Sequence, residues 1–405
     1  MKKNYASIFI FIFFSIHLFA ESLQISTKAP AAILINAKTG KILYEKDAYT
    51  PRYPASMTKL ASAIYAIDQL DGQFDEMFTA QQDAIGALSS AERIRRADTA
   101  PAYWLEHGGS HIGIKRGEKL TAKVLLYGLM VASGNDAGNV LAQSIGGSIP
   151  QFLEDLNQLL ADIGCRNTHF MNPHGLFHKD HLTTAYDLAI MAQYGMKQKL
   201  FREIVKTYRY KRPKTNKQES SFFVQTNQLL RRTSKYYYPK CTGIKTGYLS
   251  KAAYNLVSSA EDNGRSLILV LMNCKTNKDR YADSKKIFEI AFAEPKLTQK
   301  VFRKGIQKWE FSLKDANATL QTEIEDDFFL DYYPSEKPEI KASLQRKSLE
   351  LPIKKGSLVG EILLYIDGDL SDHKISLFAS NELDYTKMKK MTIFWNLYGK
   401  NMIFC

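Results

Sequence analysis

The stretch Arg52-Tyr53-Pro54-Ala55-Ser56-Met57-Thr58-Lys59-Leu60 decides how this chain is interpreted. It contains the spacing Ser-x-x-Lys, and apolar residues recur after it at intervals of three and four, which predicts a helix beginning just after Pro54. A serine and a lysine three positions apart at a helix start project from the same side, so Lys59 would lie within reach of Ser56. A serine hydroxyl attacks only when a base takes its proton, and a lysine is such a base when its pKa is lowered. The alternative is an ordinary helix cap followed by a solvated lysine.

Two further short motifs follow in order along the chain. Ser133-Gly134-Asn135 lies in a predicted turn between two helices, and Lys245-Thr246-Gly247 lies on a predicted strand. Each motif alone is weak, because the chain also contains Ser371-Asp372-His373-Lys374 and Lys38-Thr39-Gly40. These copies suit a connection between strands and a hairpin turn. Order and structural context separate the three motifs from the chance copies.

The three motifs supply complementary chemistry. Lys245 would bring a second cation towards Lys59 and lower the pKa of that amine. The Ser133 hydroxyl could relay a proton to a leaving amine. Asn135 could hold a substrate amide with both ends of its side chain, the carbonyl oxygen and the NH2 group. Together they favour a serine nucleophile with a lysine base.

The composition of the chain limits the classes of molecule that it is expected to bind. The 405 residues are 45% hydrophobic, which is enough for two cores, and the net charge of +13 suits an anionic partner. No zinc-type spacing and no nucleic-acid-binding signature is present, so we expect no metal, no cofactor and no nucleic acid. The four cysteines are widely scattered, which argues against a disulfide framework.

The N-terminus is typical of an exported protein. Lys2 and Lys3 precede the apolar run 8–19, a pattern that predicts a signal peptide over residues 1–20 and is too short for a comfortable membrane span. Leu18 stands where a small residue is preferred, so an uncleaved anchor is the alternative. We therefore expect a periplasmic location or one on the extracytoplasmic face of the cytoplasmic membrane.

The order of elements predicts two domains and a tail. Strands, several helices, three closely spaced strands and a last helix indicate an α+β domain over residues 21–295, with an antiparallel sheet, flanking helices and a helical cluster. Short strands separated by charged turns predict a small all-β domain over 296–382. Residues 383–405 place Met and aromatic residues at helical spacing beside several lysines, which favours an amphipathic helix on an anionic membrane surface. A helix docked on its own domain is the alternative.

The residues around the motifs extend the pattern. Further stretches of the same kind are Leu126–Ala137, Asn172-Pro173-His174-Gly175-Leu176, Thr184–Ala189, Thr226–Leu230, Gly243–Tyr248 and Ala253–Val257. With these flanks the chain resembles the low-molecular-mass penicillin-binding proteins, the serine-type D-alanyl-D-alanine carboxypeptidases of the peptidase S11 kind. The resemblance spans most of residues 29 to 293. Pro352–Gly356 and Val359–Gly368 are similar to that family's C-terminal domain.

The resemblance implies a role for each motif residue. Ser56 attacks the carbonyl of the penultimate D-alanine of a peptidoglycan stem peptide, and Lys59 is the general base. The oxyanion lies between the backbone N–H groups of Ser56 and Tyr248. Ser133 and Lys245 pass a proton to the departing D-alanine, and water then hydrolyses the acyl-enzyme. β-Lactams would acylate Ser56 in the same way.

It also implies a substrate-binding set. Lys245, Thr246, Gly247 and Tyr248 line the strand beside the substrate, and Thr246 helps to hold the terminal carboxylate. His174 supports the site, with a purely structural histidine as the alternative. Arg280 falls where a second partner of the carboxylate is expected, with a surface ion pair as the alternative.

The chain departs from the family in three places and leaves one alternative open. Residues 84–105 form a longer insert than expected and would be a loop or short helix beside the cleft. Tyr248 and Leu249 stand where His and Thr are frequent, and Ala253 stands where Gly is common. A class A β-lactamase is disfavoured, because 154–157 is one residue short of its Glu-x-x-Leu-Asn loop. A non-catalytic binding protein is disfavoured by the intact motifs. Carboxypeptidase and endopeptidase action both break the bond after a D-alanine, so the sequence does not separate them.

Overall fold

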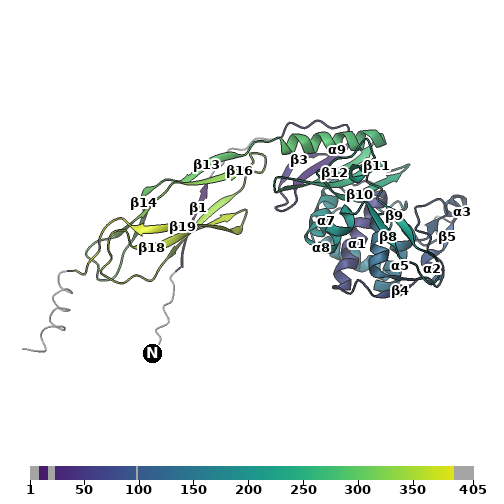
Figure 1. The fold of residues 1–405 in the computed structure, drawn as a ribbon, viewed down its shortest axis with the longest axis horizontal. Helices are drawn as coiled ribbons and strands as arrows, with labels where there is room; N and C mark the ends of the chain where they lie inside the picture. The colour runs from purple at the N-terminus through teal and green to yellow at the C-terminus, as the bar shows by residue number, and fades with distance from the viewer. Residues whose placement is uncertain (1–8, 17–22, 97–98, 387–405) are drawn as a thin grey trace, which may run out of the picture. The chain divides into compact units, whose positions relative to one another are not determined.

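The computed structural model describes residues 9–16, 23–96 and 99–386, and the chain divides into two compact units (Figure 1). Ser22–Glu294 forms the first unit, and Pro295–Cys405 together with Met1–Glu21 forms the second. Each unit has its own hydrophobic core. The predicted α+β fold with an all-β C-terminal region is confirmed.

The first unit is built on a five-stranded antiparallel sheet with the order β10-β11-β12-β2-β3. The strands are β2 (Ala31–Asn36), β3 (Ile42–Lys46), β10 (Cys241–Leu249), β11 (Ala253–Asp262) and β12 (Arg265–Cys274). Every residue of β2 is buried, and alternate side chains enter different cores: Ile33 faces the helical cluster, while Leu34 faces helix α9 (Asn277–Phe292). Because both faces are covered, the central strands β2 and β12 read as nearly continuous apolar runs.

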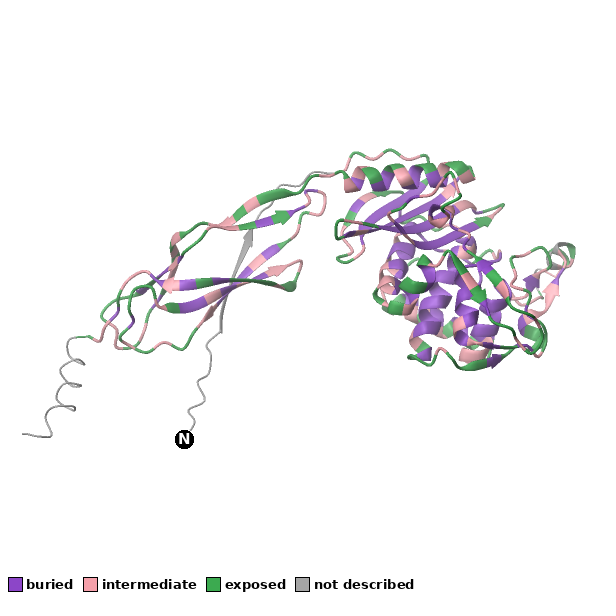
Figure 2. Cartoon of the chain, viewed as in Figure 1, coloured by how far each residue is buried: buried purple, intermediate pink, exposed green. Residues whose placement is uncertain are grey.

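Helices cover the other face of this sheet (Figure 1). They are α1 (Thr58–Leu70), α4 (Ala122–Met130), α5 (Asn135–Gly146), α6 (Ile149–Asp162), α7 (Ala185–Lys197) and α8 (Lys199–Lys206). Helix α1 is buried on nearly all sides, which explains its Ala-rich sequence (Figure 2). The side chains of Thr121, Ser148 and Thr184 cap α4, α6 and α7 by accepting backbone N–H bonds. Local capping therefore sets where the helices around the site begin.

Short elements surround the helical cluster. They are η1 (Ala55–Met57), β4 (Met77–Thr79), α2 (Gln82–Ile85), β5 (Ala87–Leu88), α3 (Ser90–Arg95), β6 (Leu105–Glu106), β7 (Lys119–Thr121), β8 (Arg209–Arg212), β9 (Ser221–Val224) and η2 (Gln228–Leu230). The insert at 84–105, expected as a loop or short helix, contains helix α3, and the parallel β5–β6 pairing brings its two ends together. The insert is therefore closed at its base.

In residues 9–16 and 295–386, the part of it that the structure describes, the second unit is all β. A six-stranded sheet has the order β1-β17-β18-β19-β15-β14, and β13 pairs separately with β16. The strands are β1 (Phe9–Ile16), β13 (Leu297–Phe302), β14 (Gly305–Phe311), β15 (Leu320–Ile324), β16 (Phe328–Tyr332), β17 (Ile340–Arg346), β18 (Leu358–Ile366) and β19 (Asp369–Ala379). β1 lies at the sheet edge, antiparallel to β17, within the segment predicted as a signal peptide. The signal peptide stays a prediction, and its removal would leave β17 as the edge strand.

Two predictions concern membranes. Within residues 9–16, 23–96 and 99–386, no helix has the length and apolar character needed to cross a bilayer. The helix predicted for the tail lies almost entirely in 387–405, outside the described residues.

Candidate active site

Ser56 lies in a tight turn between the sheet and the core helix. Helix η1 leads directly into α1, and Ala55 has a left-handed φ of 53°. The Asn255 side chain of β11 pins this turn by donating to the carbonyl oxygens of Tyr53 (3.1 Å) and Pro54 (3.2 Å). A Cβ at position 247 would lie 2.6 Å from the Pro54 carbonyl oxygen, so only glycine lets β10 approach the turn. Ser56, the predicted nucleophile, is thus held against the strand that carries the third motif.

Lys59 reaches Ser56 from one turn along α1. Its Nζ lies 3.0 Å from Ser56 Oγ and donates to Asn135 Oδ1 and to the His174 carbonyl oxygen, each at 2.6 Å. The side chain is fully buried. Burial, and next the Lys245 cation, hold the pKa of Lys59 well below its usual value, while the Asp136 carboxylate opposes the shift. The amine is therefore suited to accept a proton from the serine.

Lys245 and Ser133 form a second pair. Lys245 Nζ donates to Ser133 Oγ at 3.0 Å and to the Thr246 carbonyl oxygen at 3.1 Å. Burial, assisted by the positive charge of Arg280, lowers the pKa of Lys245 to about 7. Ser133 has a φ of 61° in the turn between α4 and α5, an uncommon conformation that presents its hydroxyl to the lysine. The structure brings together all three motifs that the sequence places up to 190 positions apart.

The residues predicted to bind substrate lie on and beside β10. The Thr246 hydroxyl donates to Thr226 Oγ1 at 2.9 Å, and the Tyr248 ring is 53% exposed, with its centroid 4.5 Å from that of Tyr254. Arg280 is 7% exposed and donates to the carbonyl oxygens of Gly247 (3.2 Å) and Asn255 (3.0 Å). The surface ion pair considered for Arg280 is wrong, because the guanidinium is buried behind the strand.

His174 contacts the site through its backbone. Its ring Nε2 lies 3.0 Å from the Tyr103 carbonyl oxygen, and its Nδ1 accepts the Leu176 N–H at 3.2 Å, which identifies Nε2 as the protonated nitrogen. The carbonyl oxygen of His174 accepts the bond from Lys59. The geometry therefore favours a supporting role for this histidine.

Sequence reasoning missed Asn139, which anchors the insert. This side chain is fully buried in α5, and its Nδ2 donates to the carbonyl oxygens of Ala84 (3.0 Å) and Tyr103 (2.8 Å), at the two ends of the insert. The Tyr103 carbonyl also receives the His174 ring, so Asn139 is connected to Lys59 through two intermediates. An amide one turn after Asn135 on the same helix was the available signal.

Two other buried polar groups were missed. The Asp136 carboxylate accepts the backbone N–H groups of residues 112–114 and so holds the loop before α4. His181 Nε2 lies 2.7 Å from Thr58 Oγ1, which donates to the Ala55 carbonyl, and burial lowers the pKa of this histidine to about 3. Both groups stiffen the backbone that carries the motifs.

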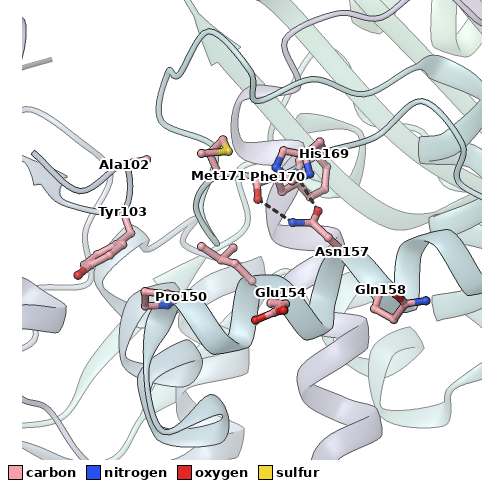
Figure 3. A pocket seen from close by; sticks show the side chains of 10 residues that line it. Ala102, Tyr103, Pro150, Glu154, Asn157, Gln158, His169, Phe170 and Met171 are labelled. Atoms are coloured by element: carbon pink, nitrogen blue, oxygen red, sulfur yellow. Dashed lines mark hydrogen bonds between the residues drawn. The ribbon is translucent and has the colours of Figure 1, made fainter. Parts of the chain in front are cut away.

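A cavity of about 550 Å³ lies beside the insert, away from these motifs (Figure 3). Tyr103, Leu153 and Phe170 are among its lining residues, and no residue of the three motifs lines it. Asn157 spans its wall by exchanging hydrogen bonds with the Phe170 backbone. The predicted reactive groups, the two lysine–serine pairs, therefore do not line this cavity.

The family model described as D-alanyl-D-alanine carboxypeptidase, peptidase S11, matches residues 19–276. The chain belongs to this family. It is 32% identical over 359 residues to D-alanyl-D-alanine carboxypeptidase DacF of Bacillus subtilis, covering 86% of this chain and 84% of that protein. It is 30% identical over 365 residues to DacA of Escherichia coli K12, covering 86% and 84%. The recognised resemblance and the reaction class, a serine-type hydrolase, are thus confirmed.

Solved structures of the family share the fold. The D-alanyl-D-alanine carboxypeptidase DacD of Francisella tularensis, at 23% identity, covers 91% of this chain and 97% of its own, with a TM-score of 0.58. The Streptomyces K15 DD-transpeptidase, at 29% identity, covers 66% of this chain and 98% of its own, with a TM-score of 0.57. The roles of individual residues are not tested by these similarities and stay predictions.

Proposed function

We propose that this chain removes the terminal D-alanine from peptidoglycan stem peptides through an acyl-enzyme on Ser56. The observation that carries the proposal is the fully buried Lys59 amine, 3.0 Å from Ser56 Oγ, with its pKa held low. A buried amine of this kind deprotonates a serine hydroxyl near neutral pH. The second lysine–serine pair supplies the proton that a leaving amine needs.

Acylation would proceed by direct attack. Ser56 Oγ bonds to the carbonyl carbon of the penultimate D-alanine while its proton moves to Lys59 Nζ. The negative oxygen is held by the backbone N–H groups of Ser56 and Tyr248, which act as fixed dipoles. Collapse breaks the C–N bond, and the departing nitrogen takes the Ser133 proton, which Lys245 replaces. The proton on Lys59 then passes to Lys245, so that Lys59 is neutral again. Water attacks the ester carbonyl while its proton moves to Lys59, and that proton passes to Ser56 Oγ as the ester bond breaks.

The remaining site residues would position the substrate. Asn135 has its Oδ1 occupied by Lys59, which leaves Nδ2 to donate to a substrate carbonyl. Thr246 would donate to the terminal carboxylate, with the Lys245 cation nearby. Arg280 would act from behind the strand, by holding the Gly247 carbonyl and by lowering the pKa of Lys245. His174 would fix the carbonyl that holds Lys59.

Acylation by a fluorescent penicillin tests this proposal. Wild type should label and should release D-alanine from diacetyl-Lys-D-Ala-D-Ala, while Ser56→Ala should do neither. Ser371→Ala, which removes the serine of the chance Ser-x-x-Lys copy, is the matched control and should behave as wild type. Labelling of Ser56→Ala, or loss of labelling in Ser371→Ala, would refute the assignment of the nucleophile.

We also propose a role for each of four segments of the chain. A signal peptide over 1–20 would direct export, 21–295 would carry the enzyme, 296–382 the β domain, and 383–405 a peripheral membrane helix. The four lysines at 387, 389, 390 and 400 support attraction to anionic lipid. Deleting 387–405 should release the mature protein from membranes, and continued retention after signal cleavage would contradict the membrane role.

A further inference from the structure

The β8–β9 hairpin presents an exposed face that the catalytic steps do not use. The two strands are antiparallel, with Arg209 opposite Val224 and Lys211 opposite Phe222. These four residues are exposed, whereas the alternate residues are buried or half-buried. We call Arg209, Lys211, Phe222 and Val224 the hairpin outer face.

The outer face combines exposed apolar side chains with cations. Phe222 is 49% exposed and Val224 40%, and the adjacent Tyr208 is 40% exposed. The Arg209 guanidinium lies 3.6 Å from the centroid of the Phe222 ring, so charge and ring share one surface. Clustered exposed aromatic residues next to arginine are typical of a binding surface.

The charge of the hairpin selects the kind of partner. Residues 206–224 contain six Lys or Arg residues and one acidic residue, Glu219. Glu219 forms an ion pair with Lys214 at 2.6 Å, at the far end of the hairpin from Arg209. The positive potential around the outer face therefore favours a polyanion.

The hairpin is rigid, which keeps the entropic cost of binding low. On its inner side Tyr210 stacks on Tyr127, with ring centroids 3.8 Å apart. At its far end Asn216 accepts the Lys119 N–H and donates to the Gly117 carbonyl, each at 2.9 Å. The outer face is thus held in a fixed geometry from both ends.

The hairpin is also continuous with the proposed substrate strand. β9 ends two residues before Thr226, whose hydroxyl accepts the bond from Thr246 at 2.9 Å. A polymer that presents a substrate branch to Thr246 would carry further branches and backbone beyond it, on the side to which β9 leads, whereas a single short peptide has none.

We infer that the hairpin outer face is an auxiliary binding surface for polymeric peptidoglycan, an anionic glycan whose peptide branches end in carboxylates. Phe222 and Tyr208 offer apolar faces to sugar rings, and Arg209 and Lys211 pair with carboxylates of neighbouring branches. The inference rests on the proposed function, because the same polymer supplies the branch that Ser56 attacks.

Co-sedimentation with purified peptidoglycan tests the surface without turnover. The full chain carrying Ser56→Ala is compared with the same chain carrying Arg209→Gln/Lys211→Gln or Phe222→Thr. Each change should weaken binding about fivefold to tenfold at low salt, as expected for the loss of two exposed charges or one aromatic contact. Lys197→Gln/Lys199→Gln, two exposed cations near the start of α8, removes the same charge and should leave binding unchanged.

The active enzyme separates this inference from the proposed function. In the Ser56 background, the hairpin variants should hydrolyse diacetyl-Lys-D-Ala-D-Ala as wild type does, and should lose activity only on polymeric peptidoglycan. Failure of wild type on the tripeptide would refute the proposed function, whereas sedimentation would still report on the surface. Unchanged sedimentation of the hairpin variants, or an equal loss in the α8 control, would overturn the inference. So would a loss confined to binding of anionic phosphatidylglycerol vesicles, because the surface would then serve a membrane.

Discussion

Adding one methyl group at Gly175 should displace the nucleophile. Gly175 has a φ of 91°, and a Cβ there would lie 1.9 Å from the Ala55 carbonyl oxygen and 2.9 Å from Thr58 Oγ1. The left-handed backbone costs an alanine about 1–2 kcal/mol. The overlap adds about 1–3 kcal/mol, because the atom it meets is backbone that cannot rotate away. Gly175→Ala should therefore lose about 2–5 kcal/mol of the free energy of unfolding.

The same overlap should reduce acylation. Ala55 directly precedes Ser56, so relief of the contact moves the hydroxyl relative to Lys59, and a displacement near 1 Å costs about 10²-fold in rate. Gly164→Ala is the matched control, since Gly164 has a φ of 98° with no atom within 4 Å of the added Cβ. Denaturant unfolding and penicillin acylation would be measured for both variants. Equal stability of the two variants, with wild-type acylation by Gly175→Ala, would refute the reasoning.

Three further outcomes follow from the buried polar groups. Arg280→Gln should raise the pKa of Lys245 from about 7, so the alkaline limb of kcat/KM should move to higher pH, whereas Arg280→Lys keeps the charge and should not move it. Asn139→Leu should lower kcat by a factor about tenfold larger than any change in KM, because it removes the hydrogen bond from Asn139 to the Tyr103 carbonyl. Gln143→Ala, which breaks the exposed contact of α5 with Asp83, should change neither kcat nor KM. His181 stays neutral in the fold down to about pH 3, so unfolding takes up a proton below pH 6.5, and the free energy of unfolding should fall by about 1.4 kcal/mol per pH unit between these values. The free energy of unfolding of His181→Gln, measured between pH 6.5 and 4.5, should depend less steeply on pH than that of wild type. An unchanged slope would contradict this.

The acidic limb of the pH–rate profile offers an independent check on the effect of Lys245 on the pKa of Lys59. Because the Lys245 cation helps to depress the pKa of Lys59, Lys245→Met should move the acidic limb to higher pH. Acylation rates across pH 5–9 report this shift even when the overall rate falls. A limb that stays in place would mean that burial alone sets the Lys59 pKa.

Local signals in the sequence were sufficient to predict the reactive residues. Ser-x-x-Lys at a helix start places Ser56 and Lys59 on one side by helical geometry alone, and the structure confirms their proximity at 3.0 Å. The helix caps and the apolar strands β10, β11 and β12 were predictable for the same reason, since short-range periodicity and side-chain chemistry determine them. The α+β fold of the catalytic unit follows from that order of elements.

Long-range contacts decided the rest. The clamp of Asn139 on both ends of the insert, and the use of the His174 backbone to hold Lys59, depend on residues more than 30 positions apart in the sequence. The substrate-binding role of Arg280 stays a prediction, whereas its contacts with the Gly247 and Asn255 carbonyls follow from the packing of α9 behind the sheet. By itself the sequence determined the predicted reactive groups. Only the tertiary structure decided how low their pKa values lie and what holds them, because burial and neighbouring charge are set by segments that meet only on folding.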